Sequence, residues 1–263
     1  MPLPRRPPRA LTLAIAAILL AATAYVLLDR GYVRFVYPSW REYPVRGVDV
    51  SHHNGRVDWP RIRASGYTFA YLKATEGATW RDSTFARNRA EAVRAGLVTG
   101  AYHFFTLCRP GREQARNFVA VLGAPSPASL PPAVDLEFGG NCGERPSREA
   151  LRAELGAFLA VLDSAGHPPA VLYVTEEFHR AYLDGQPVTN PLWVRSVFGR
   201  PRFGGAWIFW QYAATGRVAG AKGRIDLNAF RGSPAAFRTF LAPGGFSPRT
   251  LTGSRPPLAG QLR

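Results

Sequence analysis

The chain has 263 residues, of which 46% are hydrophobic and 19% are charged. This composition excludes a disordered or fibrous protein, and two cysteines are too few for a disulfide-dense scaffold or a four-cysteine zinc site. The net charge of +15 comes almost entirely from arginines, which are scattered along the chain rather than gathered in one basic helix. We therefore expect no nucleic-acid partner, whereas an anionic membrane or wall polymer would suit such a surface.

The first feature along the chain is an apolar segment, Leu11–Leu28, which contains no charged residue. As a helix it would extend roughly 27 Å, close to the thickness of a bilayer's hydrocarbon core. Three arginines precede it, so the positive-inside rule places residues 1–10 in the cytoplasm and the rest of the chain outside. We interpret residues 11–28 as an uncleaved transmembrane signal anchor, because Tyr25–Leu28 continue the apolar run beyond the cleavage-like triplet Ala22–Ala24. The alternative is secretion after signal cleavage.

Three regions follow the apolar segment. Residues 29–43 are interpreted as a juxtamembrane linker whose aromatic residues suit a membrane interface. Residues 44–242 form the predicted folded domain. Residues 243–263 are rich in Pro, Gly, Ser and Arg without periodicity, which predicts a disordered tail.

Within the domain, short β-rich runs alternate with helical patterns. The predicted strands are Gly47–Val50, Thr68–Ala74, Gly100–Phe104, Ala133–Leu136, Ala170–Val174, Leu192–Arg195, Ala206–Tyr212 and Arg224–Leu227. The predicted helices are Trp59–Ser65, Ser83–Ala95, Gly111–Leu122 and Ser147–Ala165. This alternation is typical of a parallel sheet covered by helices. Because the connections after the sixth strand are too short for full helices, we predict an irregular TIM-like (β/α) barrel of the α/β class, with about eight strands and fewer than eight helices.

Carboxylates gather at the predicted strand ends, where such barrels carry their sites. Asp49, Asp135 and Asp226 each lie between two branched aliphatic residues, and Glu137 follows two positions after Asp135. Strand alternation places Asp135 and Glu137 on one face with Cα atoms about 6.6 Å apart, while Val134 and Leu136 face the helices. Two carboxylates this close split their pKa values into an acid and a base or anion, as glycoside hydrolysis requires. A single such Asp would more often cap a helix or order a turn.

The histidines do not predict a metal site. His52 and His53 are neighbours on a segment taken as extended, where they would point to opposite sides, and no His-x-His or His-Glu-x-x-His spacing occurs. We expect His103 to pack or hydrogen-bond within the barrel wall. We predict neither a metal nor a cofactor.

Aromatic and amide side chains at strand ends suit the apolar faces and hydroxyls of sugars. Candidate substrate-binding residues of this kind are Tyr102, Tyr173, Trp193 and Gln211. In the run Trp207–Tyr212, alternation places Trp207, Phe209 and Gln211 on one face and the intervening residues on the other. For any single aromatic residue, ordinary core packing is the competing interpretation.

Two further pairs lie near the expected site. Lys73 and Glu76 close the second strand, where a substrate contact and a structural ion pair are equally consistent with the sequence. Cys108 and Cys142 lie on the loops after the third and fourth strands. Outside the cytoplasm a disulfide between these loops is reasonable, and two free buried thiols are the alternative.

Seven short motifs follow one another at sensible spacing between residues 46 and 232. They are Gly47–His53, Asp58-Trp59, Tyr71–Gly77, Gly100–Phe105, Pro132–Glu137, Trp210–Tyr212 and Ile225–Asn228. Together they resemble glycoside hydrolase family 25, the Chalaropsis-type lysozymes or N-acetylmuramidases. The resemblance implies an irregular (β/α) barrel that hydrolyses the β-1,4 bond between N-acetylmuramic acid and N-acetylglucosamine in peptidoglycan. The apolar segment and the tail lie outside it, and no wall-binding repeat is visible.

The resemblance also implies roles for single residues. Glu137 would be the general acid, Asp135 its catalytic partner, and Asp49 and Asp226 would complete the acidic floor. Asp135 would either stabilise an oxocarbenium charge or orient the substrate's 2-acetamido group, and the sequence does not choose between these routes and direct attack by water.

We therefore expect a monomeric peptidoglycan hydrolase in the bacterial cytoplasmic membrane, with its catalytic domain in the periplasm or cell wall. Its partners would be glycan strands and, through the N-terminal helix, the membrane. Two alternatives remain: a membrane-tethered peptidoglycan-binding module without turnover, and a hydrolase of another amino sugar polymer such as chitin.

Overall fold

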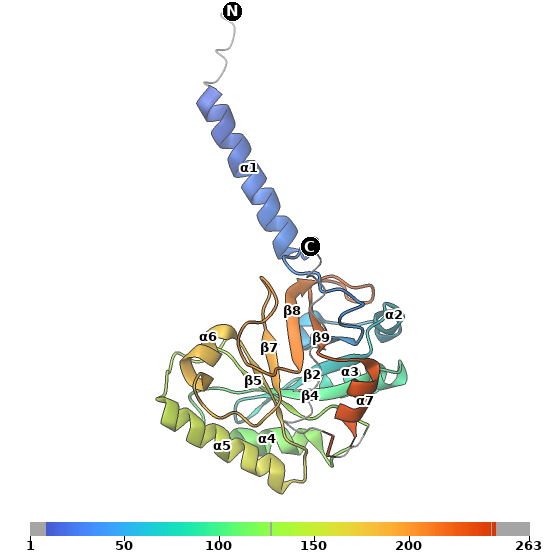
Figure 1. The fold of residues 1–263 in the computed structure, drawn as a ribbon, viewed down its shortest axis with the longest axis vertical. Helices are drawn as coiled ribbons and strands as arrows, with labels where there is room; N and C mark the ends of the chain where they lie inside the picture. Colours follow the sequence, from blue (N-terminus) through green and yellow to red (C-terminus); the bar gives the residue numbers. More distant parts are fainter. Residues whose placement is uncertain (1–8, 127, 243, 246–263) are drawn as a thin grey trace, which may run out of the picture.

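The computed structural model describes residues 9–126, 128–242 and 244–245. It consists of a barrel from which one long helix projects (Figure 1). Almost all of the predicted tail, residues 243–263, lies outside the described residues, as do residues 1–8 of the predicted cytoplasmic segment.

The barrel strands and the helices fall close to their predicted positions. The strands are β1 (Arg46–Val50), β2 (Phe69–Glu76), β3 (Trp80–Arg81), β4 (Val98–Phe104), β5 (Ala133–Leu136), β6 (Val171–Val174), β7 (Leu192–Arg195), β8 (Phe209–Gly216) and β9 (Ile225–Phe230). The α-helices are α1 (Arg9–Asp29), α2 (Trp59–Ala64), α3 (Phe85–Arg94), α4 (Gly111–Leu122), α5 (Arg148–Ser164), α6 (Glu176–Phe178) and α7 (Pro234–Leu241). A 3₁₀ turn (His52–Asn54) and a π-helical turn (His179–Leu183) complete the described elements.

The sheet closes into a ring of eight strands. β1 pairs with β2 on one side and with β9 on the other, and the strands between them pair in chain order, while the short β3 extends β2 as an edge hairpin. With seven α-helices among the described residues, the predicted irregular barrel is confirmed.

The last strand contradicts the prediction of a parallel sheet. β9 is antiparallel to both β8 and β1, because residues 217–224 are too few for the crossover connection that a parallel strand needs. Asp226 therefore lies near the beginning of β9 rather than at its end. The reversed direction still brings Asp226 to the barrel end where the other strands finish, since Asp226 is the register partner of Asp49.

β8 begins at Phe209, three residues later than predicted, and this corrects part of the alternation. From Phe209 onward the predicted faces hold, with Phe209 inside the barrel and Trp210 outside. Before the strand begins the faces are reversed: Trp207 packs in the outer layer and Ile208 packs inside. Period-two alternation applies only to extended backbone.

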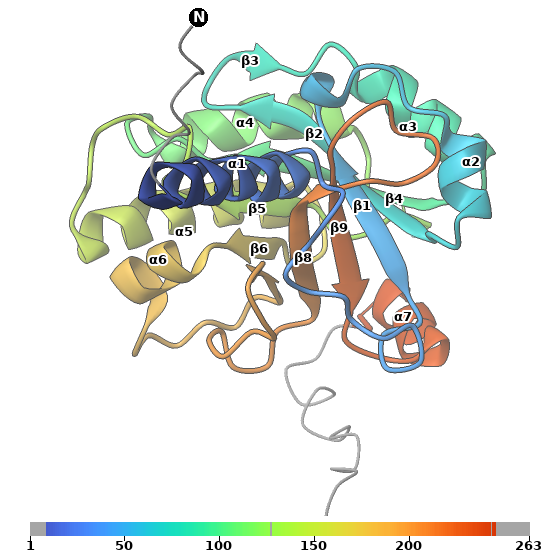
Figure 2. The same ribbon diagram turned by 90° about the horizontal axis from the view of Figure 1, so that it is seen from above.

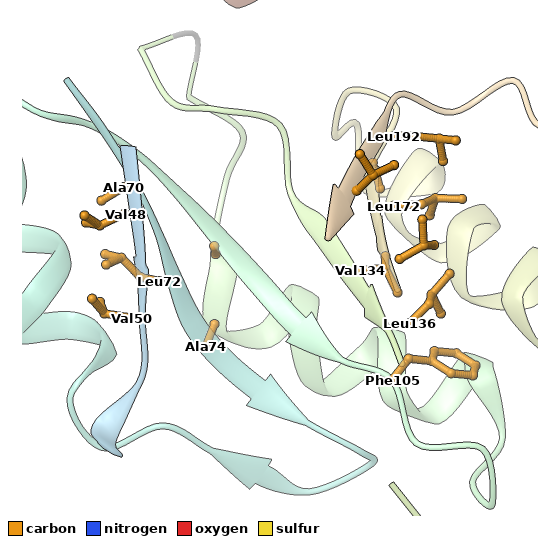
Figure 3. Packing of buried hydrophobic residues seen from close by; sticks show 14 of the residues in the cluster. Val48, Val50, Ala70, Leu72, Ala74, Phe105, Val134, Leu136, Leu172 and Leu192 are labelled. Atoms are coloured by element: carbon orange, nitrogen blue, oxygen red, sulfur yellow. The ribbon is translucent and has the colours of Figure 1, made fainter. Parts of the chain in front are cut away.

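Two apolar layers hold the barrel together. The outer layer lies between strands and helices and contains alternate strand residues, such as Val48 and Val50 of β1 and the predicted pair Val134 and Leu136 of β5 (Figure 3). The inner layer fills the barrel itself. Together they leave the strands buried on both faces, as expected for a helix-covered sheet.

The inner layer is largely aromatic. Tyr71 stacks on Trp193 with ring centroids 4.8 Å apart, and Phe69 contacts Phe237 of α7 at 5.6 Å. A methyl group at Gly100 would collide with the Tyr71 ring, so glycine makes room for it. α7 and these rings fill the barrel interior at the end where the parallel strands begin. The polar residues of the interior therefore lie at the other end, where the parallel strands finish.

The predicted juxtamembrane linker is packed on the barrel. Residues 30–45, called the strap below, cross the outside of β8 and β9 and reach the beginning of β1 (Figure 2). The guanidinium of Arg46 is buried and donates to Pro38 O at 2.7 Å and to Tyr43 O at 2.6 Å. The strap thus covers the part of the barrel that has no crossover helix.

The helix α1 matches the predicted membrane segment. It is long and apolar enough to cross a membrane, and none of its side chains is buried against the barrel. A signal sequence near the N-terminus has the same properties.

Phe158 of α5 provides a test of the outer layer. It is fully buried and contacts the rings of His103, Phe105 and Phe118. We expect Phe158→Ala to lower the free energy of unfolding by about 3–5 kcal/mol, because it leaves a cavity. Denaturant unfolding in detergent measures this, with Phe198→Ala as the control since Phe198 is 78% exposed. Equal losses in both variants would contradict the packing described here.

Candidate active site

A cavity of about 280 Å³ opens at the barrel end where β1 to β8 finish. It is lined by Asp49, Tyr102, Asp135, Glu137, Tyr173, Trp193, Arg195, Gln211, Ala214 and Asp226. The four candidate catalytic carboxylates and four of the six candidate substrate-binding residues thus lie around one space. They come from seven strands and from the residue that follows β5.

Asp49 is held by amide donors that are themselves oriented by aromatic side chains. The Tyr173 hydroxyl donates to Gln211 Oε1 at 2.9 Å, and Gln211 Nε2 donates to Asp49 Oδ1 at 3.1 Å. On the other side Trp193 Nε1 donates to Asn228 Oδ1 at 2.8 Å, and Asn228 Nδ2 donates to Asp49 Oδ1 at 2.6 Å. Because each amide oxygen is occupied by a donor, both amide nitrogens must face the carboxylate.

Asp49 and Asp226 form a coupled pair across β1 and β9. Burial raises the pKa of both carboxyls, and the negative charge of Asp49 raises the pKa of Asp226 further. The amide donors and a hydrogen bond from Asp226 act against burial at Asp49 and favour its ionised form. Asp226 therefore keeps its proton to higher pH than Asp49 does.

Asp135 and Glu137 form the second pair, on consecutive positions of the same face. Burial raises the pKa of both carboxyls, and the charge of Glu137 raises the pKa of Asp135 further. Arg195 Nη1 lies 3.4 Å from Glu137 Oε2 and lowers the pKa of Glu137 against the effect of burial. Two carboxyl groups this close cannot both ionise freely, because their negative charges repel. The pair therefore keeps at least one proton near neutral pH.

Comparison with known proteins agrees with this arrangement. Residues 48–221 match the sequence profile of Glycosyl hydrolases family 25. The chain is 35% identical over 207 residues to Lysozyme M1 of Streptomyces globisporus, a match that covers 73% of this chain and 69% of that protein. The chain belongs to glycoside hydrolase family 25.

Solved structures show the same fold. A family 25 glycosyl hydrolase from Bacillus anthracis superposes with a TM-score of 0.71 at 32% identity, over 77% of this chain and 95% of that one. A bacterial lysozyme from Streptomyces coelicolor gives a TM-score of 0.67 at 32% identity, over 75% and 96% of the two chains. In both comparisons the family 25 barrel accounts for nearly all of the other protein.

Two candidate substrate-binding residues of this family 25 hydrolase do not line the cavity. Lys73 Nζ pairs with Glu76 Oε2 at 2.6 Å, so the sequence prediction of an ion pair is the one that the structure realises. A β-bulge between Lys73 and Thr75 makes the pair possible, because the extra residue turns Glu76 to the same face as Lys73. Lys73 acts on the site through its charge, which lowers the pKa of Asp135.

The histidines lie outside the cavity. His52 and His53 belong to a 3₁₀ turn with ring centroids 3.9 Å apart, so the premise that they lie on an extended segment was wrong. His103 is fully buried in the wall, 2.7 Å from the Thr75 hydroxyl and 3.2 Å from Gln114 Oε1, as predicted. Within the described ranges, no group of three or more His, Cys, Asp or Glu residues is arranged to hold a metal ion.

Two polar residues of the site, Arg195 and Asn228, were not among the predicted site residues. Arg195 ends β7 two positions after Trp193, and Asn228 lies two positions after Asp226 on β9. Strand alternation, had it been applied from Trp193 and from Asp226, would have placed both on the inner face.

Cys108 and Cys142 form a disulfide between the loops after β4 and β5, with Cα atoms 6.3 Å apart. Asn141, next to Cys142, ties these loops together further, because its Oδ1 accepts from Leu107 N at 2.9 Å and its Nδ2 donates to Glu137 O at 2.9 Å. The bridge therefore braces the cavity rim beside Glu137.

Reduction tests this bridge. The disulfide joins two cysteines that are 34 positions apart in the sequence. Closing a loop of that size restricts the unfolded chain and contributes about 3–4 kcal/mol to the free energy of unfolding. We expect dithiothreitol to lower the free energy of unfolding of the full chain by about that amount. A Cys108→Ser/Cys142→Ser variant should show no response to the reductant. Identical unfolding curves of the unaltered chain with and without reductant would count against the bridge.

Proposed function

We propose that this family 25 hydrolase is a peptidoglycan muramidase that cleaves the β-1,4 bond between N-acetylmuramic acid and N-acetylglucosamine. The observation that carries the proposal is the convergence of Asp49, Asp135, Glu137 and Asp226 on one cavity beside tyrosine and tryptophan rings. Among its relatives, the N,O-diacetylmuramidase of Arthroderma benhamiae is 28% identical over 217 residues. The convergence of all four carboxylates favours turnover over simple wall binding.

Glu137 is the proposed general acid. It is half-buried at the cavity rim, whereas Asp135 is buried deeper in β5, so Glu137 is the carboxyl that can reach a glycosidic oxygen. Its pKa is raised by burial, which keeps it protonated to higher pH than an exposed glutamate. When it gives its proton to the leaving oxygen, the nearby Arg195 stabilises the new carboxylate.

The remaining carboxylates are proposed to serve the sugar that becomes positively charged. Asp135 lies beside Glu137, and because burial and the charge of Glu137 raise its pKa, it is proposed to orient the substrate's 2-acetamido group through a hydrogen bond. Asp49 carries the fixed negative charge of the floor, and Asp226 holds the proton that keeps this pair from repelling the others. Tyr102 lines the wall and offers aromatic surface to the sugar rings, whereas the buried Trp193 acts through its hydrogen bond to Asn228.

We also propose that α1 is an uncleaved anchor in the cytoplasmic membrane, with the barrel on the outer side. Family 25 muramidases act on peptidoglycan outside the cell, and the arginine-rich N-terminus favours an N-inside orientation. The packed strap supports an uncleaved segment, since it continues directly from α1. That the protein is a monomer remains a prediction.

The first test replaces the proposed acid. We expect Glu137→Gln to reduce the release of reducing ends from purified peptidoglycan by about 10²–10⁴-fold, because glutamine cannot donate the proton. Glu113→Gln on α4 serves as the control. Mass spectrometry should find muropeptides with reducing N-acetylmuramic acid in the wild-type digest. Undiminished turnover by Glu137→Gln, or cleavage of chitin but not peptidoglycan by the wild type, would refute the assignment.

The second test concerns Arg195. Its charge lowers the pKa of Glu137, so Arg195→Gln should raise that pKa further. The alkaline limb of the pH profile of kcat/KM reports loss of the acid's proton. This limb should therefore move to higher pH in the Arg195→Gln variant. Arg200→Gln, which removes a partner of Glu42 away from the cavity, is the matched control. An alkaline limb that stays in place or moves to lower pH would contradict the role given to Glu137.

A further inference from the structure

The end of α1 is fixed to the barrel. Asp29 Oδ1 accepts from Arg224 Nη1 at 2.6 Å, and the Arg217 guanidinium lies over the Tyr32 ring at 4.4 Å. Gly31 ends the helix with a φ of +72°, and a side chain there would overlap with the carbonyl of Thr215. An ion pair, a cation–ring contact and a close backbone approach thus tie the end of α1 to the β8–β9 connection.

This attachment point lies on the wall of the catalytic cavity. Thr215 follows Ala214, which lines the cavity, and Arg224 precedes the cavity residue Asp226 by two positions. One strand residue spans about 3.3 Å, so the end of α1 lies on the order of 10 Å from the cavity lining.

The length of α1 fixes the height of this wall above a membrane. Its 21 residues span roughly 31 Å, which matches a bilayer's hydrocarbon core without excess. Asp29 then lies at the headgroups, and the cavity wall lies just outside them. A free linker in place of the strap would reach about 50 Å and leave the barrel's height and orientation open. Figure 1 shows α1 projecting away from the barrel, with its end meeting the barrel near β8.

Exposed aromatic side chains lie at the same rim. Phe198 is 78% exposed and follows the cavity residue Arg195 by three positions, while Phe35 and Tyr32 of the strap are each 61% exposed. The rings of Phe35 and Phe198 contact each other at 5.0 Å. Aromatic residues beside a membrane helix favour the headgroup region, and the arginines of this rim match its phosphates. The loop after β7, which carries Phe198, is therefore expected at the same distance from the membrane surface as the end of α1.

We propose that the cleft acts on glycan strands held at the membrane surface, namely strands still attached to a lipid through pyrophosphate. The inference rests on the muramidase function and on the membrane anchor proposed above. Since the cavity is held beside the headgroups, it meets the lipid-proximal part of such a strand and cannot swing out to distant wall layers. The enzyme would therefore leave short saccharide stubs on the lipid.

The test uses the full chain in vesicles of phosphatidylethanolamine and phosphatidylglycerol that also carry glycan strands on polyprenyl pyrophosphate. A second sample receives the same strands, released from the lipid by mild acid, as free substrate. The decisive variant carries a Gly/Ser insertion of about 20 residues after Leu28, which keeps the strap docked but lets the barrel move about 25 Å. The matched control carries the same insertion after Gly123, an exposed glycine in the loop between α4 and β5.

We expect the wild type and the Gly123 control to leave short lipid-attached stubs, whereas the Leu28 insertion should shift the stubs to longer and broader lengths. All three should cleave free strands at rates within about twofold of one another, since the tether changes only effective concentration and orientation. Stub lengths that are equally broad in the wild type and the Leu28 variant would overturn the inference while leaving the muramidase function intact. Failure of the wild type to cleave either form would overturn the muramidase function itself.

Discussion

The site depends on one buried carboxylate, Asp49, and on the donors that hold it. Gln211 of β8 and Asn228 of β9 both direct their amide nitrogens at Asp49, and Tyr173 and Trp193 prevent either amide from turning round. A buried charge is tolerated only when such donors satisfy it. The same hydrogen bonds join five strands across the barrel, so the network that stabilises the charge also closes the barrel at the catalytic end.

The surroundings of Asp49 set the electrostatics of the whole cavity. Aromatic rings fill the barrel below it, so the four carboxylates share a poorly hydrated space with Arg195 at one wall and the charge of Lys73 nearby. Burial raises the pKa of every carboxyl there, and the donors decide which group ionises first. Amide donors thereby favour ionisation of Asp49, whereas burial and a neighbouring charge keep the pKa values of Asp135 and Asp226 well above the ordinary value.

The irregular part of the barrel connects the catalytic end to α1. Where a regular barrel would have a crossover helix between its last strands, this chain has the short β8–β9 connection and the strap. The strap covers the exposed strands and carries α1 to the cavity rim, where Arg224 and Gly31 fix it. The departure from regular (β/α) architecture is therefore what brings the cavity rim and α1 together.

The sequence by itself determined the elements, the apolar helix, the inward pairing of Asp135 with Glu137 and the family motifs, because strand and helix periodicity and short motifs are local properties. Tertiary structure alone decided the direction of β9, which reversed the expected position of Asp226 along its strand, and the bulge that turns Glu76 toward Lys73. It also decided that the strap is packed and that Asn228 faces Asp49. Strand direction, register and docking depend on contacts between distant segments, and their free energies are not encoded in the local spacing of residues.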